Sequence, residues 1–196
     1  MPHPLMKRKC WIFDMDGTLT LAQHDFLAIR DALGLPMNQT ILESLAQLPE
    51  HEAAPKRAQL QAIELEIASK ALAAPNAHQV LEYLNTQGTQ IGILTRNSLQ
   101  NIEVTLKAAG LWEYFGVDNL VSRDCALPKP HPAGIERLLV QWQAPATEAV
   151  MVGDFLYDLQ AGRAANTATV YIDPSEKFNH RAFADLCISD LGQLLD

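Results

Sequence analysis

Cysteine is scarce in this sequence of 196 residues, which holds only Cys10, Cys125 and Cys187, far apart from one another. There is no Cys-x-x-Cys pair, and the count is odd. Disulfide-stabilised secreted domains and structural zinc sites depend on paired or closely spaced cysteines, so both are disfavoured. We interpret each cysteine as a small, buried or half-buried apolar residue.

Long apolar runs and an excess of basic charge are also missing. No apolar stretch approaches the ~18 residues of a membrane span, and no signal-peptide pattern is present. Acidic residues outnumber basic ones by 23 to 15, for a formal net charge of −8. Nucleic-acid-binding proteins usually carry a basic stripe. We therefore expect a cytoplasmic protein, a monomer or weak dimer, with neither nucleic acid nor membrane as a partner.

Short apolar runs alternate with helical patterns along most of the chain. This alternation is typical of parallel strands joined by helical crossovers, and strands buried on both faces are apolar throughout. We predict an α/β fold, a Rossmann-like doubly wound parallel sheet. The expected strands are Cys10–Phe13, Ile91–Leu94, Leu120–Val121, Val150–Val152 and Thr169–Ile172. The expected helices are Ala77–Thr86, Leu99–Ala109, Ala133–Gln141, Leu156–Ala165 and Asp190–Leu195, with Asn76 as the cap that begins the first of them.

The stretch from 21 to 74 interrupts this alternation because it contains only helical pattern. Leu60, Ile63, Ile67 and Ala71 recur at helical spacing. A crossover of this length without structure is improbable in a compact domain. The sequence therefore predicts a small α-helical insert at 21–74 within a core formed by 1–20 and 75–196.

Carboxylates follow two of the predicted strands. Asp14 and Asp16 follow the first strand, and Asp154 follows the fourth, with Asp158 one helical turn later. Ligands of open α/β sheets bind beyond the carboxyl ends of the strands, and closely spaced carboxylates repel one another unless a cation intervenes. Mg²⁺ prefers such oxygen ligands. As alternatives to a metal site, Asp16-Gly17 could form an ordinary turn, and Asp154 could cap the following helix.

Two further segments could bind an anion. Thr95 ends the second strand and Asn97 precedes a helix, where a hydroxyl, free backbone N–H groups and the helix dipole all favour negative charge. Lys129 lies between prolines that restrict the backbone around it. The alternative for Asn97 is that it only caps the following helix, and the alternative for Lys129 is that it is a solvated surface lysine.

Together these segments resemble the four motifs of the haloacid dehalogenase superfamily. The matching residues are Asp14-x-Asp16-Gly17-Thr18-Leu19, Thr95, Lys129 and Gly153-Asp154-x-x-x-Asp158. The position of the insert is similar to that of the helical cap in the phosphoglycolate-phosphatase-like branch. Residues 20–21, Thr-Leu, depart from the Asp or Val-Asp found in many relatives of this branch.

The resemblance implies a Mg²⁺-dependent phosphatase that acts through a phospho-aspartate. Asp14 would be the nucleophile and Asp16 the acid and base, while Thr95 and Lys129 would bind the phosphoryl oxygens. The implied metal ligands are Asp14, the backbone carbonyl of Asp16, and Asp154, with Asp158 close by. A phosphomutase of the β-phosphoglucomutase type shares every motif and stays open, as does a non-catalytic phosphometabolite-binding module. A dehalogenase does not use the second aspartate, so Asp16 counts against it.

The substrate is expected to be a small phosphorylated metabolite, because a helical lid suits a small molecule. Arg96 and Asn97 lie beside the predicted phosphate site and are expected to bind substrate. Further polar candidates in the insert are His24, Arg30, Lys56 and Arg57.

Overall fold

The computed structural model describes residues 2–36 and 39–196, and its centre is a parallel β-sheet. Six strands lie in the order β3-β2-β1-β4-β5-β6, and every neighbouring pair is parallel. The strands are β1 (Cys10–Phe13), β2 (Gln90–Leu94), β3 (Leu120–Val121), β4 (Ala149–Gly153), β5 (Ala168–Ile172) and β6 (Leu186–Ile188). This order is that of a Rossmann-like doubly wound sheet, so the predicted fold class is confirmed.

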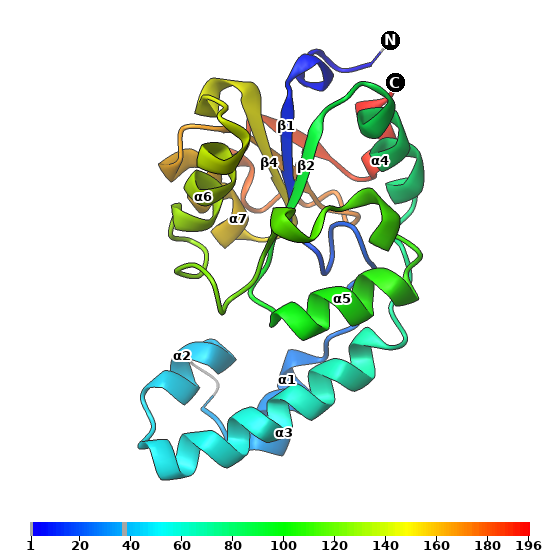
Figure 1. Ribbon diagram of the computed structural model, residues 1–196. Coiled ribbons are helices and arrows are strands. Elements are labelled where there is room, and N and C mark those ends of the chain that lie inside the picture. Colours follow the sequence, from blue (N-terminus) through cyan, green and yellow to red (C-terminus); the bar gives the residue numbers. More distant parts are fainter. Residues whose placement is uncertain (1, 37–38) are drawn as a thin grey trace.

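Helices cover both faces of the sheet (Figure 1). They are α4 (Ala77–Thr86), α5 (Leu99–Ala108), α6 (Ala133–Trp142) and α7 (Leu156–Ala164). Trp11 and Phe13 of β1 belong to a buried apolar cluster with residues of α4 and α5. Ile12, between them, belongs to a second cluster with residues of α6 and α7. Because successive side chains of a strand point to opposite faces, β1 is apolar at every position.

The register of the central strands brings their carboxyl ends together. Phe13 at the end of β1 is paired with Ile93 of β2 on one side and with Val152 of β4 on the other. The backbone N–H of Asp14 continues this ladder and donates to the carbonyl of Val152 at 2.9 Å. The residues that follow β1, β2 and β4 therefore emerge at one edge of the sheet.

Three α-helices of the described residues lie between β1 and α4: α1 (Phe26–Leu33), α2 (Ile41–Ala46) and α3 (Glu50–Ala68). They share a buried apolar cluster that is separate from the two beside the sheet: Ile29, Leu33, Leu35, Ile41, Leu45 and Leu60. Figure 1 shows these helices, coloured blue to cyan, below the sheet and beyond the carboxyl ends of β1 and β2. The helical spacing predicts helix through Ala71, but α3 ends at Ala68, so the predicted end is wrong by three residues.

The C-terminal part differs from the prediction in two ways. Strand β6 was not predicted, and the helix expected over Asp190–Leu195 is a 3-10 helix, η6 (Leu191–Leu194). The Asn76 side chain makes no capping hydrogen bond at α4, although Asn76 precedes the helix. Its Nδ2 instead donates to Oδ1 of Asp190 at 2.5 Å and so ties the start of α4 to the end of the chain.

The remaining short helices are also of the 3-10 type. They are η1 (Pro4–Lys7), η2 (Trp112–Tyr114), η3 (Val117–Asn119), η4 (Ala146–Glu148) and η5 (Arg181–Phe183). Across residues 2–36 and 39–196, no helix combines the length and the apolar character needed to cross a membrane.

Candidate active site

The loop after β1 carries the first two aspartates to the edge of the sheet. Asp14 is buried, with 8 % of its surface exposed, directly after the strand. The chain then turns at Gly17, whose φ of +82° favours glycine. The backbone carbonyl of Met15 accepts from the N–H groups of both Leu19 and Thr20, which closes the turn. The turn thus reverses the chain immediately after the two carboxylates.

The second pair of aspartates lies where β4 passes into α7. Oδ2 of Asp158 accepts from the backbone N–H of Phe155 at 3.0 Å, in the capping arrangement that begins α7. A Cβ atom on Gly153 would lie 2.2 Å from Cβ of Asp158. Glycine is therefore required at the end of β4 for the Asp158 side chain to turn back beneath the strand.

Lys129 links the two aspartate pairs. Its side chain is only 4 % exposed, and its Nζ lies 2.6 Å from Oδ1 of Asp14 and 2.5 Å from Oδ1 of Asp158. Burial alone would lower the pKa of Lys129, but the two carboxylates outweigh it and raise the pKa above its ordinary value. The lysine is therefore a fixed positive charge, and the alternative of a solvated surface lysine is wrong.

Three carboxylates gather around this lysine. One oxygen each from Asp14, Asp154 and Asp158 can be chosen so that all lie within 4.8 Å of one another. Burial raises the pKa of Asp154 to about 8, and the charges of Asp14 and Asp158 add to the rise. Burial likewise raises the pKa of Asp158 to about 6, against the attraction of Lys129. The cluster has more negative charge than one lysine neutralises, and its oxygen donors suit a hard divalent cation such as Mg²⁺.

The side chain of Asp16 has different partners from those of the cluster. Its Oδ2 accepts from Nδ2 of Asn97 at 2.5 Å, and its Oδ1 lies 3.8 Å from Nδ1 of His24. Burial raises the pKa of Asp16 above its ordinary value, although His24 and the Asn97 hydrogen bond favour the charged form. Among the described residues, the Asp16 carboxylate is not part of the cation-type cluster.

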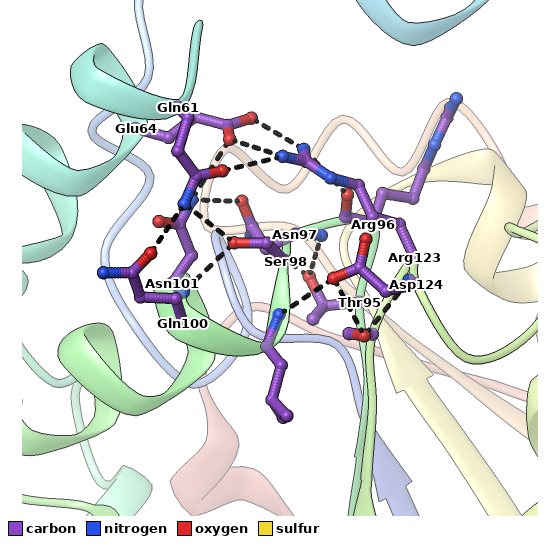
Figure 2. A network of polar contacts seen from close by, with 12 residues as sticks. Gln61, Glu64, Thr95, Arg96, Asn97, Ser98, Gln100, Asn101, Arg123 and Asp124 are labelled. Carbon is purple, nitrogen blue, oxygen red and sulfur yellow. Dashed lines mark hydrogen bonds and ion pairs between the residues drawn. The ribbon is translucent and has the colours of Figure 1, made fainter. Parts of the chain in front are cut away.

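Thr95 and Asn97 form the turn between β2 and α5. The Thr95 hydroxyl accepts from the backbone N–H of Asn97 at 3.2 Å and from its Nδ2 at 3.1 Å. Ser98, not Asn97, caps α5 by accepting from the backbone N–H of Asn101. The Asn97 side chain is therefore available to contact Asp16, and Figure 2 shows this turn beside the neighbouring polar residues.

Arg96 extends from the same turn toward the inserted helices. Its Nη2 donates to Oγ1 of Thr40 at 3.3 Å and lies 3.8 Å from Oε1 of Glu43. The guanidinium carbon also lies 5.4 Å from the centre of the Tyr157 ring. Arg96 thus contacts both the insert and the start of α7.

A cavity of about 420 Å³ joins these groups, within the usual range of small-ligand sites of roughly 300–1,000 Å³. The predicted site residues all line it: Asp14, Asp16, Thr95, Arg96, Asn97, Lys129, Asp154 and Asp158. Apolar side chains of the insert, among them Phe26, Ile41 and Leu60, complete the wall. His24 and Arg30 also line the cavity, whereas Lys56 donates to the Leu33 carbonyl and Arg57 pairs with Glu50 within the insert. The arrangement can hold an anion and a cation side by side.

One feature of the site was missed in the sequence. Arg123, after β3, donates through Nη1 and Nη2 to both carboxylate oxygens of Glu64 on α3, each at 3.1 Å (Figure 2). Glu64 lines the cavity. No motif or spacing marks this pair, because its members lie 59 residues apart in two separate segments.

Comparison with known proteins agrees with this geometry. The family model described as haloacid dehalogenase-like hydrolase matches residues 20–172. An uncharacterised hydrolase of Saccharomyces cerevisiae is 28% identical over 195 residues, covering 96% of this chain and 89% of the yeast protein. A protein of Dickeya dadantii named "Probable phosphatase IndB" is 30% identical over 182 residues, covering 81% of this chain and 78% of its own length. The crystal structure of a hydrolase from Pseudomonas syringae has the same fold, with a TM-score of 0.80 and 24% identity over 96% of both chains.

Proposed function

Because the chain belongs to the haloacid dehalogenase-like hydrolases, we propose that it is a Mg²⁺-dependent phosphatase that hydrolyses a small phosphorylated metabolite. The observation that carries the proposal is the placement of buried Lys129 between Asp14 and Asp158, with Asp154 in the same cluster, in a cavity of about 420 Å³. A buried lysine beside carboxylates can attract a dianionic phosphate while a cation neutralises the rest of the charge. The closest alternative chemistry is that of a phosphomutase.

The donor set fits Mg²⁺. Asp14, Asp154 and Asp158 would hold the ion, with Asp16 contributing through its backbone carbonyl. The raised pKa of Asp154 supports this assignment, because burial, and then the charges of Asp14 and Asp158, disfavour its charged form, which a bound cation would stabilise. When bound, the ion would withdraw charge from the phosphoryl oxygens, so that a carboxylate can approach phosphorus.

In the proposed reaction, an oxygen of Asp14 attacks phosphorus and the bond from phosphorus to the alcohol oxygen breaks. The phosphoryl group is then carried by Asp14, and water attacks phosphorus to release inorganic phosphate and restore the carboxylate. Lys129 and Thr95 would hold the phosphoryl oxygens during both steps, while Asn97, whose Nδ2 donates to Asp16 and Thr95, would orient these two groups beside the substrate. The contact of Lys129 with Asp14 supports this role, since one ammonium group could then bridge nucleophile and substrate.

Asp16 is the proposed acid and base. It would give a proton to the departing alkoxide and later take one from the attacking water. Two features support this role: burial raises its pKa, and its carboxylate is held by Asn97 outside the cation-type cluster. A carboxyl group in such surroundings is more readily protonated than a metal-bound one.

We also propose that residues 21–74 form a cap on a core of 1–20 and 75–196. The two connections lie side by side: the Leu21 N–H donates to the Leu72 carbonyl at 3.0 Å, and the Ala74 N–H donates to the Leu19 carbonyl at 2.8 Å. The separate apolar cluster of the insert supports the same division. A cap attached by two adjacent connecting segments can open and close over the cavity.

The cap and cavity suit a small substrate, one that fills about 420 Å³ together with its phosphate. Arg96, His24 and Arg30 are the proposed groups that contact its leaving part, because all three line the cavity. The proposed setting is the cytoplasm, with the protein as a monomer or weak dimer.

The test is phosphate release from p-nitrophenyl phosphate and from a panel of phosphorylated metabolites, with Mg²⁺ and with excess chelator. We expect release that requires Mg²⁺ and is lost by several orders of magnitude in Asp14→Asn, because an amide is not a nucleophile. An Asp14→Asn variant of near-normal rate would contradict the proposal. Conversion of a sugar phosphate to its isomer without phosphate release would identify a phosphomutase, and phosphate binding without turnover a binding module.

A further inference from the structure

A continuous chain of polar contacts runs from the cap to Asp16, and Figure 2 shows its part from Glu64 through Asn101 to Asn97. Oε2 of Glu64 on α3 accepts from Nδ2 of Asn101 on α5 at 3.2 Å. The same Nδ2 lies 3.4 Å from Oδ1 of Asn97, and Nδ2 of Asn97 donates to Oδ2 of Asp16 at 2.5 Å. Glu64, Asn101, Asn97 and Asp16 are thus joined in one line, each by a hydrogen bond.

The cap end of this chain is fixed. Arg123 holds both oxygens of Glu64, and the two side chains are only 18% and 11% exposed. Two parallel hydrogen bonds between a guanidinium and a carboxylate set the orientation of both groups. Nη2 of Arg123 also donates to Oε1 of Gln61 at 3.2 Å, so α3 presents two partners to one arginine. Docking of α3 therefore places the Glu64 carboxylate at a defined position above α5.

The direction of each hydrogen bond is also defined. Asn101 is 1% exposed, and its amide group faces two acceptors, one on Glu64 and one on Asn97. Only the NH₂ side of an amide can satisfy two acceptors, so its Oδ1 is left buried without a partner among the described residues. The amide of Asn97 must then turn its oxygen toward Asn101 and its NH₂ toward Asp16.

The alternative orientation of Asn97 would be unfavourable for Asp16. With the amide turned by half a rotation, its oxygen would face the Asp16 carboxylate, and two acceptors would repel. Asn101 opposes that rotation as long as Glu64 holds it. The cap residue thus helps to keep a donor beside Asp16.

We propose that Glu64 is a positioning residue that couples docking of the cap to the orientation of Asp16, through Asn101 and Asn97. The inference rests on the proposed function, in which Asp16 delivers the proton to the leaving group. With α3 docked, the chain is complete and Asp16 faces the cavity in one orientation. With α3 displaced, Asn101 loses Glu64, and the orientation of the Asn97 amide then depends only on its contacts with Asp16 and Thr95. Proton delivery is then strongest when the cap is closed.

Kinetics with a series of leaving groups test this coupling. Aryl phosphates of decreasing leaving-group acidity, ending with an alkyl phosphate, are compared through kcat/KM, which reports the first phosphoryl transfer. For Glu64→Gln we expect about a tenfold loss with the alkyl phosphate and little loss with the nitrophenyl ester, because general acid catalysis matters most for poor leaving groups. Asn101→Ala cuts the same chain from the core side and should give the same pattern even if Glu64→Gln folds poorly.

Gln61→Ala is the matched control. Gln61 lies one turn before Glu64 and contacts Arg123, Ser98 and Gln100 across the same boundary, so this variant removes neighbouring contacts of α3 while Arg123 still holds Glu64 and the chain to Asp16 stays intact. We expect any loss in Gln61→Ala to be equal for all leaving groups. Two results would overturn the inference. One is a leaving-group dependence in both Glu64→Gln and Asn101→Ala that equals that of the wild type. The other is a leaving-group dependence in Gln61→Ala that is altered as much as in those two variants.

A measurement without substrate separates this inference from the proposed function. The side-chain amide signal of Asn97 in ¹⁵N NMR spectra, identified by its absence in Asn97→Ala, reports the hydrogen bond to Asp16. It should move in Glu64→Gln and Asn101→Ala and stay in place in Gln61→Ala; an unmoved signal in the first two overturns the coupling. A wild-type protein that is inactive on every phosphate ester but shows these shifts would contradict the proposed function and support the positioning of Asp16.

Discussion

Gly17 passes so close to Asp154 that a Cβ atom at Gly17 would lie 2.3 Å from the Asp154 Oδ2. The loop after β1 therefore packs directly on a carboxylate that follows β4, and the two halves of the carboxylate site are in contact. Both the left-handed backbone and the lack of a side chain at this position are needed for that contact.

Gly17→Ala should therefore impair the site more than the fold. An alanine at positive φ costs on the order of 1–2 kcal/mol, and its methyl group must also displace Asp154. We expect a Tm lower by several degrees and a weakened Mg²⁺ affinity, measured by calorimetric titration. Gly88→Ala is the control, because Gly88 also has a positive φ but a Cβ there meets nothing within 4 Å. Equal Mg²⁺ affinity in the two variants would contradict the role given to Gly17.

Asp16→Asn should slow both halves of the proposed reaction, since each uses the proton of Asp16. The loss in kcat/KM should be smallest for nitrophenyl phosphate, whose leaving group needs little protonation, and largest for alkyl phosphates. The check is the slope of log kcat/KM against leaving-group pKa in the variant and in the wild type. Parallel slopes would count against Asp16 as the acid.

The stability of the metal-free protein should depend on pH through Asp154. Its pKa is about 8 in the folded protein and ordinarily 3.8, so between these values the folded state binds more protons than the unfolded chain. Stability from this group is therefore present at low pH and is lost as the pH rises toward about 8. Mg²⁺ replaces the proton and should raise Tm more at about pH 8 than at about pH 5. Asp154→Asn should reduce this difference, leaving the part that comes from Asp158, whose pKa of about 6 lies in the same range; a Tm increase independent of pH in the wild type would contradict the prediction.

Arg96→Ala should raise KM more than it lowers kcat. Arg96 contacts Thr40 and the Tyr157 ring beside the cavity and takes no part in the proposed bond making. Steady-state kinetics on the best substrate of the panel provide the check. Arg57→Ala is a suitable control, since Arg57 pairs with Glu50 within the insert and should leave KM unchanged. A fall in kcat with constant KM would assign Arg96 to the chemical step.

Strands β1 to β5 could be predicted because each is a short, largely apolar run, a pattern that the amphipathic helices of the surface do not have. Strand β6 could not, since it spans only Leu186–Ile188 and two of its three residues are half-buried. Six residues at Asp190–Leu195 are also too few to separate an α-helix from a 3-10 helix by periodicity.

The residues of the site divide in the same way. Some are placed by their own strand, and others by contacts between segments that are distant in the sequence. Asp14, Thr95 and Asp154 could be placed together because each follows a parallel strand, and the ends of neighbouring strands share one edge. Glu64 and Arg123 could not, because their contact depends on how α3 lies against the core. Glu64 is a charged residue on a helix with no wide apolar face, and its burial becomes evident only in three dimensions.

Because the connections at Leu19–Leu21 and Leu72–Ala74 lie side by side, the insert is joined to the rest of the protein at a single place. The chain leaves the core and returns to it at neighbouring positions. The distance between these two positions therefore does not depend on the length or structure of the segment between them. A foreign loop or a different lid could be transplanted there while every strand keeps its partners. Under the proposed function, selectivity for the leaving group and the chemistry at phosphorus could then diversify separately, the first by exchange of the proposed cap and the second by point changes at the strand ends.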